Sequence, residues 1–232
     1  MTGEEVVRYV RERTDTVVLS FSAGKDAVAM WLRVRGRFPR IVPIYFYAVP
    51  GLSFVERALA YYEDFFGAKI VRLPQPGLYQ TLELGTFQSP AQRLVTARCG
   101  IESFSRADAM RAALEDRDLD PDSAWTLAGV RAADSLQRRQ AMLTTGGINA
   151  RRKIAYPVWD WRKDDLLRVF RESGVKLAPD YQVWGQTFDG VDERFMAGLR
   201  EHYPEDYERI RALYGAVDAD RARWRFGHAT QA

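Results

Sequence analysis

The stretch Thr16–Ala27, TVVLSFSAGKDA, decides the fold of this chain. Its first five residues are a mostly β-branched apolar run, which is typical of a buried strand. The small residues of positions 22–24 (SAG) then favour a tight turn. Beyond the turn, apolar side chains recur at helical spacing, at Val28, Trp31 and Leu32. The sequence therefore predicts a strand, a turn and a helix in direct succession.

Two more segments of the first half repeat this alternation. The apolar run Ile41–Val49 is continuous, as expected for a strand covered on both faces. A helix is predicted from Ser53, which can cap its N-terminus, to Gly67, and a third strand over Lys69–Leu73. The inward face of that helix is expected to hold Phe54, Ala58, Leu59, Tyr62 and Phe65. The order βαβαβ favours a mostly parallel, doubly wound sheet with helices on both faces.

The rest of the chain is predicted to complete the sheet and then to become helical. Residues 75–100 have no clean period and are expected to form a partly helical excursion over the sheet edge. The remaining predicted elements are a helix at 102–115, strands at 125–129 and 154–157, and a helix at 163–173. We therefore expect a nucleotide-binding α/β domain over residues 1–160 and a C-terminal helical appendage over residues 161–232, packed on it.

Composition narrows the class of protein. The 232 residues are 47% apolar and 28% charged, with a net charge of +3, which is ordinary for a globular protein. The single cysteine, Cys99, excludes an intrachain disulfide and a thiolate cage for zinc or a four-cysteine cluster. No run of 18 apolar residues occurs, and the first five residues are polar and acidic. We expect a cytoplasmic protein with no membrane partner; the aromatic-rich C-terminal part is a candidate surface for a homo-oligomer.

Positive charge is concentrated in one segment. Between Gly129 and Lys153 there are six basic residues and one acid, a local excess of +5. Such a segment is either a solvated face or an anion site, because clustered guanidinium groups bind phosphate or sulfate through forked hydrogen bonds. The sequence leaves both interpretations open.

The turn after the first strand has the chemistry of a phosphate site. Ligands of open parallel sheets bind at the carboxyl ends of strands, where backbone N–H groups and the helix dipole favour an anion. Ser22 adds a hydroxyl and Lys25 a mobile positive charge. The Walker spacing G-x-x-x-x-G-K-[ST] is absent. The alternative to phosphate binding is a capped helix followed by a surface lysine.

Three segments together carry a resemblance to a known family. Residues 20–27 (SFSAGKDA) resemble the S-G-G-K-D-S pyrophosphate loop of the PP-loop ATP pyrophosphatases, and residues 129–135 (GVRAADS) with Arg138-Arg139 resemble a segment of their phosphoadenylylsulfate (PAPS) reductase-like branch. Residues 156–161 (YPVWDW) are similar to the P-[IL]-x-x-W segment of that branch. The matches occur in the order of the family, between about Val17 and Leu167.

The resemblance implies an adenine nucleotide alpha hydrolase-like fold with adenosine across the carboxyl edge of the sheet. By carry-over, the nucleotide would be held by Ser20, Phe21, Ser22, Ala23, Gly24, Lys25, Asp26, Tyr47, Gly129, Arg131 and Arg138. Backbone near Ser20 and Phe21 would meet the adenosine, and the aromatic ring of Tyr47 would stack on adenine or pack in the core. The residues implied in catalysis are Ser22, Lys25, Asp26 and Arg131, with ATP or PAPS as nucleotide and Mg²⁺ bound through its phosphates; the resemblance implies no protein metal cage.

Departures from the family pattern bear on the chemistry. The first loop glycine is replaced by Ala23, which is tolerable if φ there is negative, and the last serine by Ala27. After the second strand, Val49-Pro50-Gly51 stands where the family commonly has D-T-G. Thiol-dependent PAPS reductases use a cysteine near the C-terminus, but no cysteine follows Cys99 here.

Three functions remain after these departures. The first is an ATP pyrophosphatase that releases pyrophosphate and adenylates an acceptor, in sulfur transfer or in nucleic-acid modification. The second is a protein that binds a sulfonucleotide such as PAPS, with any reductive thiol supplied from outside. The third is a nucleotide-binding module without catalysis. Cys99 is a further candidate, as a nucleophile among arginines or as an inert residue.

Overall fold

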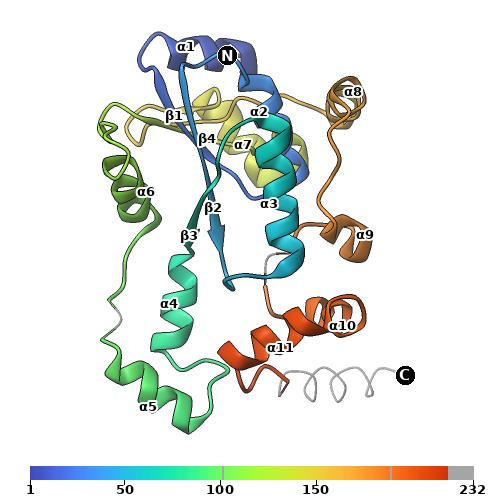
Figure 1. The fold of residues 1–232 in the computed structure, drawn as a ribbon. Helices are drawn as coiled ribbons and strands as arrows, with labels where there is room; N and C mark the ends of the chain where they lie inside the picture. Colours follow the sequence, from blue (N-terminus) through green and yellow to red (C-terminus); the bar gives the residue numbers. More distant parts are fainter. Residues whose placement is uncertain (101, 189, 219–232) are drawn as a thin grey trace. The chain divides into compact units, whose positions relative to one another are not determined.

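A computed structural model describes residues 1–100, 102–188 and 190–218 (Figure 1). The described residues form a six-stranded sheet of order β3-β2-β1-β4-β6-β5. The strands are β1 (Thr16–Ser20), β2 (Arg40–Tyr47), β3 (Val71–Pro74), β4 (Trp125–Ala128), β5 (Ile148–Asn149) and β6 (Ile154–Ala155). Strand β1 pairs in parallel with β2 and β4, β4 pairs in parallel with β6, and β5 runs antiparallel to β6. The predicted α/β class with a mostly parallel sheet is confirmed.

Eleven α-helices occur in the described part of the chain. They are α1 (Gly3–Arg11), α2 (Lys25–Val34), α3 (Ser53–Phe66), α4 (Pro76–Glu83), α5 (Pro90–Arg98), α6 (Arg106–Glu115), α7 (Leu136–Thr145), α8 (Lys163–Ser173), α9 (Asp180–Trp184), α10 (Glu193–His202) and α11 (Pro204–Leu213). None of these helices is both long enough and apolar enough to span a bilayer.

Burial of the central strand explains why its apolar run folds as it does. Every residue of β1 except Ser20 is buried. Val18 packs with Val42 and Ile44 of β2 against Leu114 of α6, which covers that face of the sheet. Helix α2 follows β1 directly and contacts both β1 and β4. Because side chains alternate along a strand, this arrangement requires apolar residues at successive positions, as the sequence has them.

Aromatic rings fix the packing of α2. Phe21 and Trp31 meet edge to face with ring centroids 5.1 Å apart, and Trp31 stacks on Phe66 at 4.0 Å. Tyr62 packs edge-on to Phe21 at 5.4 Å. Leu32, expected on this inward face, is only half-buried, and so is Phe65; the buried ring at that end of α3 is Phe66.

Several element boundaries differ from the sequence prediction. The strand β5 was not predicted, because a two-residue strand carries no readable period. Residues 75–100 contain two helices, α4 and α5, each with a proline in its first turn. The helix predicted from residue 102 begins at Arg106. The helix predicted at 163–173 is confirmed, and it ends at Gly174, which is left-handed.

The chain divides into two compact units that do not follow the expected boundary at residue 160. Unit 1 comprises 1–46, 59–73 and 109–178, and unit 2 comprises 47–58, 74–108 and 179–232, of which residues 219–232 lie outside the described part of the chain. Helix α8, expected in the C-terminal appendage, belongs to unit 1 and packs on α2.

Unit 2 has its own aromatic core. Phe54, Trp184, Phe188, Phe195 and Tyr203 lie in mutual ring contact. The C-terminal helices therefore pack on segments from the first half of the chain, which the sequence pattern alone did not indicate.

The N-terminus of α3 is capped differently from the prediction. Ser53 is the first helical residue, and both its N–H and its hydroxyl donate to the carboxylate of Asp206, at 2.7–2.9 Å. Asp206 is 1% exposed and also accepts, at 3.4 Å, from the N–H of Phe54. The cap is thus an acid from α11, not the serine predicted from local sequence.

Candidate nucleotide site

The candidate site lies where the winding of the sheet reverses. Strands β1 and β4 are neighbours, with Ser20 paired to Ala128, while β2 follows on one side and β6 on the other. At such a switch point the loops that leave the two central strands diverge and leave a crevice at the carboxyl edge. The loop 20–26 leaves β1 there, and Gly129 and Arg131 follow β4. The two sequence segments predicted to bind phosphate are therefore brought together.

The loop after β1 presents a hydroxyl to solvent. Phe21 is buried, and its N–H donates to the carbonyl of Ile44 at 2.9 Å, which extends the pairing with β2 by one residue. Ser22 is exposed, and its Oγ accepts from the N–H of Gly24 at 3.4 Å. The hydroxyl predicted to meet phosphate therefore faces outward from a fixed backbone.

Ala23 has the positive φ at which alanine is less favourable than glycine. Its φ is +58°, in the left-handed region, and its side chain is buried. The condition of a negative φ is therefore not met, so the family's glycine is replaced here at a cost of about 1–2 kcal/mol in backbone strain. Strain of this kind persists only where surrounding structure holds the loop in place.

The N-terminus of α2 can receive an anion. Gly24 is its N-cap, with φ −75° and ψ 159°, and no side chain caps the first turn. The first N–H groups of a helix have no intrahelical partner, and the dipole adds positive potential at that end. The side chain of Lys25, 44% exposed, stands at the same end. Hydroxyl, helix terminus and ammonium group together fit a polyphosphate.

Five charged side chains form an ion network around this loop. Arg131 is 6% exposed; its Nε donates to Asp26 Oδ1 and its Nη2 to Asp134 Oδ1, both at 2.6 Å. Lys25 Nζ lies 3.3 Å from Asp26 Oδ2, and Arg138 Nη1 lies 3.4 Å from Asp134 Oδ2. The network, Lys25–Asp26–Arg131–Asp134–Arg138, alternates in sign and joins the α2 terminus to the segment after β4.

Arg131 is held within the network. Two of its nitrogens donate to the carboxylates of Asp26 and Asp134, so its charge is balanced there and it orients Asp26. Its predicted role in catalysis stays a prediction. Asp134 was quoted in the motif but not among the predicted site residues. Asp134 could have been predicted from its spacing in the sequence. It follows Arg131 by three residues and precedes Arg138 by four, which places its carboxylate within reach of both arginines.

Gly129 is required by a close approach of two backbones. A Cβ at this position would lie 2.6 Å from the carbonyl oxygen of Asp26 and 2.8 Å from the nitrogen of Ala27. The chain leaving β4 therefore lies against the first turn of α2 with no room for a side chain. This contact sets the distance between the loop after β1 and the segment after β4, which together form the candidate site.

The third resembling segment is tied to the second. The N–H of Ala132 donates to the carbonyl of Trp159 at 2.8 Å, and Asp160 Oδ2 accepts from the N–H of Gly3 at 2.8 Å. A Cβ on Gly147 would lie 2.5 Å from Cδ1 of Trp159, so the indole ring lies on the backbone there. All three family-like segments thus converge in unit 1.

Tyr47 is the one predicted nucleotide residue outside unit 1. It ends β2 and belongs to unit 2, where its carbonyl accepts from the N–H of Gln75 at 2.9 Å. Burial, and secondly the neighbouring Tyr79, raise the pKa of its hydroxyl. Its predicted stacking on adenine stays a prediction.

The donor set around the loop does not make a metal cage. Within the described ranges, no three His, Cys, Asp or Glu residues gather as metal ligands. The carboxylate of Asp26 is already bound by Arg131 and Lys25. The residues therefore fit a metal ion carried by the phosphates of a nucleotide better than one held by the protein. Cys99 is exposed at the end of α5 in unit 2.

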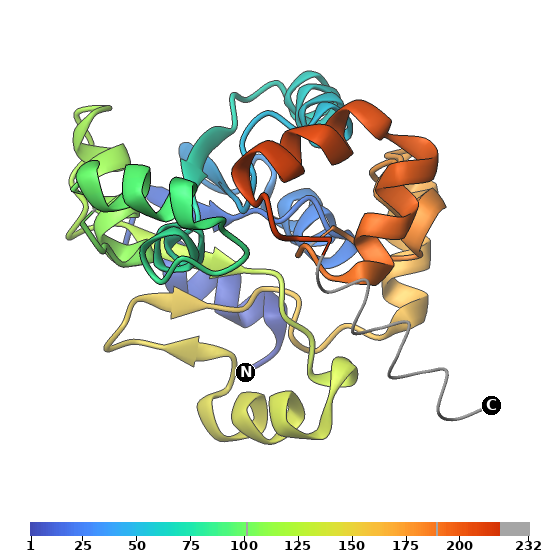
Figure 2. The ribbon, with the colours of Figure 1, turned by 90° about the horizontal axis from the view of Figure 1, so that it is seen from below.

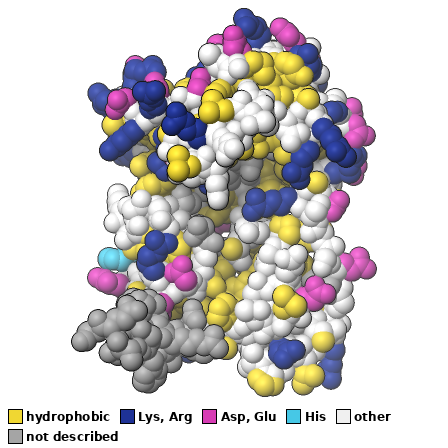
Figure 3. All heavy atoms as spheres, turned by 180° about the vertical axis from the view of Figure 1, so that it is seen from behind, with side chains coloured by type: hydrophobic (Ala, Val, Ile, Leu, Met, Phe, Trp, Pro, Cys, Tyr) yellow, Lys and Arg dark blue, Asp and Glu magenta, His cyan; other side chains and the backbone are white. Residues whose placement is uncertain are grey.

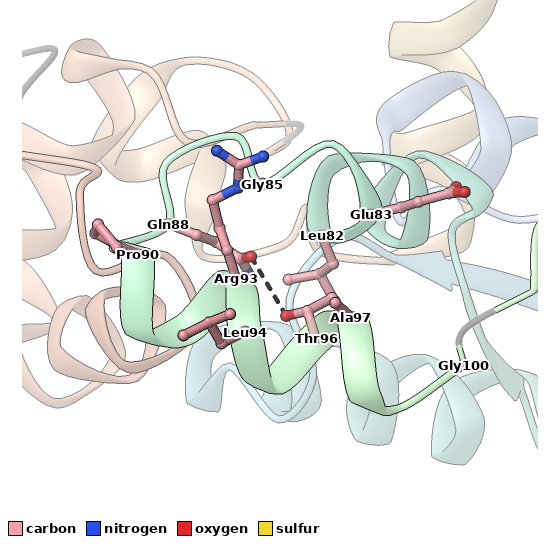
Figure 4. A pocket seen from close by; sticks show the side chains of 10 residues that line it. All are labelled: Leu82, Glu83, Gly85, Gln88, Pro90, Arg93, Leu94, Thr96, Ala97 and Gly100. Carbon is pink, nitrogen blue, oxygen red and sulfur yellow. Dashed lines mark hydrogen bonds between the residues drawn. The ribbon is translucent and has the colours of Figure 1, made fainter.

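Each unit contains a sizeable cavity lined by described residues. In unit 1, a cavity of about 620 Å³ is lined by residues of 132–143 and 159–162. In unit 2, a cavity of about 740 Å³ lies between α4 and α5 (Figure 4). The latter is lined mainly by apolar and neutral side chains, with Glu83 and Arg93 as its charged residues, and contains none of the predicted site residues.

Comparisons with known proteins find distant likenesses among solved structures. No family model and no curated protein matches the chain. The chain is similar to the U34-tRNA thiolase NcsA from Methanococcus maripaludis, with 13% identity and a TM-score of 0.46 over 93% of this chain and 78% of that one. It is also similar to the NH₃-dependent NAD synthetase from Campylobacter jejuni, with 11% identity and a TM-score of 0.44 over 94% and 93% of the two chains. Likenesses this distant decide nothing about activity.

Proposed function

We propose that the chain is a PP-loop nucleotide-binding enzyme, similar to the PAPS reductase-like branch, that cleaves ATP to AMP and pyrophosphate and adenylates an acceptor. The observation that carries the proposal is the meeting, at the switch point of the sheet, of an uncapped α2 N-terminus with the ion network anchored by Arg131. The alternative, a capped helix followed by a surface lysine, gives no reason for a buried arginine bound to Asp26, the residue next to that lysine.

Each residue of the loop has a role that follows from its geometry. Ser22 and the first N–H groups of α2 hold phosphate oxygens, and Lys25 neutralises charge on the outer phosphates. Asp26, fixed by Arg131, keeps the ammonium of Lys25 directed along the helix end. Because these groups are oriented before substrate arrives, they stabilise charge that develops during the reaction.

The reaction is a displacement at the α-phosphorus. An oxygen of the acceptor forms a bond to the α-phosphorus as the bond to the α,β-bridging oxygen breaks, and pyrophosphate leaves with that electron pair. The acceptor gains an AMP group and loses a proton. Catalysis comes from positioning and from positive charge near the leaving pyrophosphate, with Mg²⁺ bound by the phosphates. The sequence has no cysteine after Cys99, which supports this reaction over thiol-dependent reduction of a sulfonucleotide.

Calorimetric titration with ATP, AMP and 3′-phosphoadenosine 5′-phosphate, in the presence of Mg²⁺, tests the proposal. We expect ATP to bind more tightly than AMP, and Lys25→Ala to weaken ATP at least tenfold while changing AMP affinity less. Lys176→Ala removes an exposed lysine of the same unit and serves as the control.

Three outcomes decide among the functions. Equal ATP affinity in wild type and Lys25→Ala would refute the phosphate-loop assignment. Tighter binding of the 3′-phosphorylated nucleotide would favour a sulfonucleotide-binding protein. Tight ATP binding without pyrophosphate release, tested with a panel of acceptors that includes nucleic acid, would favour a module without catalysis.

A further inference from the structure

The cavity of about 620 Å³ in unit 1 adjoins the ion network. Ala132 and Ser135, on either side of Asp134, line it, and so do residues of the YPVWDW segment. The larger side chains of its wall are Leu136, Arg139, Leu143, Trp159, Trp161 and Arg162. Its size is within the range of pockets that hold small organic ligands. A group bound there would lie beside the segment that carries Arg131.

The charge of this cavity favours an anion. Arg139 and Arg162 are both exposed, and neither forms an ion pair with another described side chain. The acid of the wall, Asp160, already accepts a hydrogen bond from the N–H of Gly3. Both arginines are therefore exposed at the wall, where Asp160 is occupied by Gly3, although the charge of Arg162 also helps to lower the pKa of Asp165. Such an arrangement is suited to phosphate oxygens.

The apolar part of the wall favours a flat ring. Trp159 is half-buried and its indole Nε1 has no hydrogen-bond partner among the described residues. Leu136 and Leu143 are 83% and 65% exposed, which is unusual for leucines that follow one another along a helix face. An aromatic ring beside aliphatic side chains provides a stacking surface for a base.

Two further exposed arginines lie in the turn that leads into β6, at the opposite end of that strand from residues 159–162. The β5–β6 hairpin, the pair of yellow strands in Figure 2, contacts α7 through β5. Its turn includes Arg151 and Arg152, which are both exposed. Neither has an ion pair among the described residues, whereas Arg131 and Arg138 are neutralised within the ion network. Figure 3 shows one face of the molecule, on which Lys and Arg side chains gather mainly over the upper half with scattered acids among them. Of the six basic residues in 129–153, Arg139, Arg151 and Arg152 are thus the ones for which no ion pair or side-chain hydrogen bond is seen with the described residues.

We propose that this cavity and the hairpin beside it bind single-stranded nucleic acid. An unstacked base lies against Trp159 between Leu136 and Leu143, and its phosphates contact Arg139 and Arg162. The strand continues over the hairpin. This inference rests on the proposed function in one respect: the bound strand would be the acceptor of the AMP group. Binding of the strand itself requires no ATP. The cavity is large enough for one base, and a base can enter it only when it is not stacked in a duplex. A single strand is therefore favoured over a duplex.

Fluorescence anisotropy with a labelled 12-nucleotide single strand of mixed sequence, without ATP, tests the inference. The double variant Arg139→Ala/Arg162→Ala is expected to bind at least tenfold more weakly. The slope of log affinity against log salt concentration should become shallower by about 1.4, since each phosphate contact on a single strand contributes about 0.7. Trp159→Leu is expected to weaken binding at least fivefold, the lower end for loss of one stacked base.

Arg171→Ala, which removes an exposed arginine from the last turn of α8, is the matched control and should bind within twofold of wild type. Circular dichroism verifies that each variant is folded; Arg139→Ala alone is the substitute if the double variant is not. Absence of binding by wild type, an equal effect of Arg171→Ala, or equally effective competition by an oligoglutamate peptide would overturn the inference. ATP titration of wild type is run in parallel, so failure of ATP binding would count against the proposed function and not against this surface.

Discussion

Substituting Gly129 by alanine should disturb the site through the backbone alone. The added Cβ would lie 2.6 Å from the carbonyl oxygen of Asp26, about 0.8 Å inside the distance of about 3.4 Å at which ordinary contact begins. The atoms it meets belong to the first turn of α2 and not to a flexible side chain. The strand end and the helix must therefore move apart, and Asp26 moves with the helix.

The size of the effect follows from the cost of overpacking, which is about 1–3 kcal/mol. A loss of about 2 kcal/mol in the free energy of unfolding corresponds to a fall in Tm of roughly 4–8 °C for a chain of this length. Displacement of Asp26 also lengthens its 2.6 Å contact with Arg131 Nε, so ATP affinity should fall as well. The two effects have one cause and should appear together.

Thermal unfolding followed by circular dichroism, with ATP titration on the same preparation, measures both effects. Gly77→Ala is the control, because a Cβ there meets only the side chain of Gln75 at 3.6 Å and α4 gains helix propensity. We expect that control to be neutral or slightly stabilising. A Gly129→Ala protein with the wild-type Tm and ATP affinity would refute the close-approach argument.

Three other changes test interactions that lie within one unit each. Burial raises the pKa of Glu63, but hydrogen bonds from Arg72 and from the backbone N–H of Ile70 lower it overall. Glu63 therefore contributes stability above a pH of about 4.5, and this stability is lost as the pH falls through the lowered pKa. In urea denaturation over a series of pH values, Glu63→Gln should flatten the fall of the unfolding free energy on the acid side, here called the acid limb. An equally steep acid limb in the variant would contradict this reasoning. Asp206→Ala removes the buried cap on Ser53 and should lower the free energy of unfolding by about 1–3 kcal/mol, measured by chemical denaturation, whereas a change below 0.5 kcal/mol would mean that water replaces the cap. Ala23→Gly relieves a φ of +58° and should raise Tm by up to about 3 °C, since relief of strain exceeds the added entropy of glycine in the unfolded chain; a fall in Tm would show that the buried methyl group matters more.

The sequence alone determined the elements whose signals are local. The run Thr16–Ser20 is apolar because β1 is buried on both faces, and periodicity reads that directly. The α8 helix was predicted at its observed bounds because its acids, its period and Gly174 all act within one segment. The loop 20–26 was predicted to be a phosphate site from equally local signals, because its hydroxyl, small residues and lysine are contiguous; that prediction awaits the ATP titration.

Only the tertiary structure decided how separated segments meet. Asp26 and Arg131 are 105 residues apart, and their ion pair exists because β1 and β4 are neighbours in the sheet. No local pattern encodes that pairing, since the energy of a contact depends on distance in space and not along the chain. The same holds for Asp206 as the cap of α3, and for the positive φ of Ala23, which the surrounding fold imposes against the preference of alanine. Local propensity thus determined which elements form, and long-range packing decided which side chains they bring together.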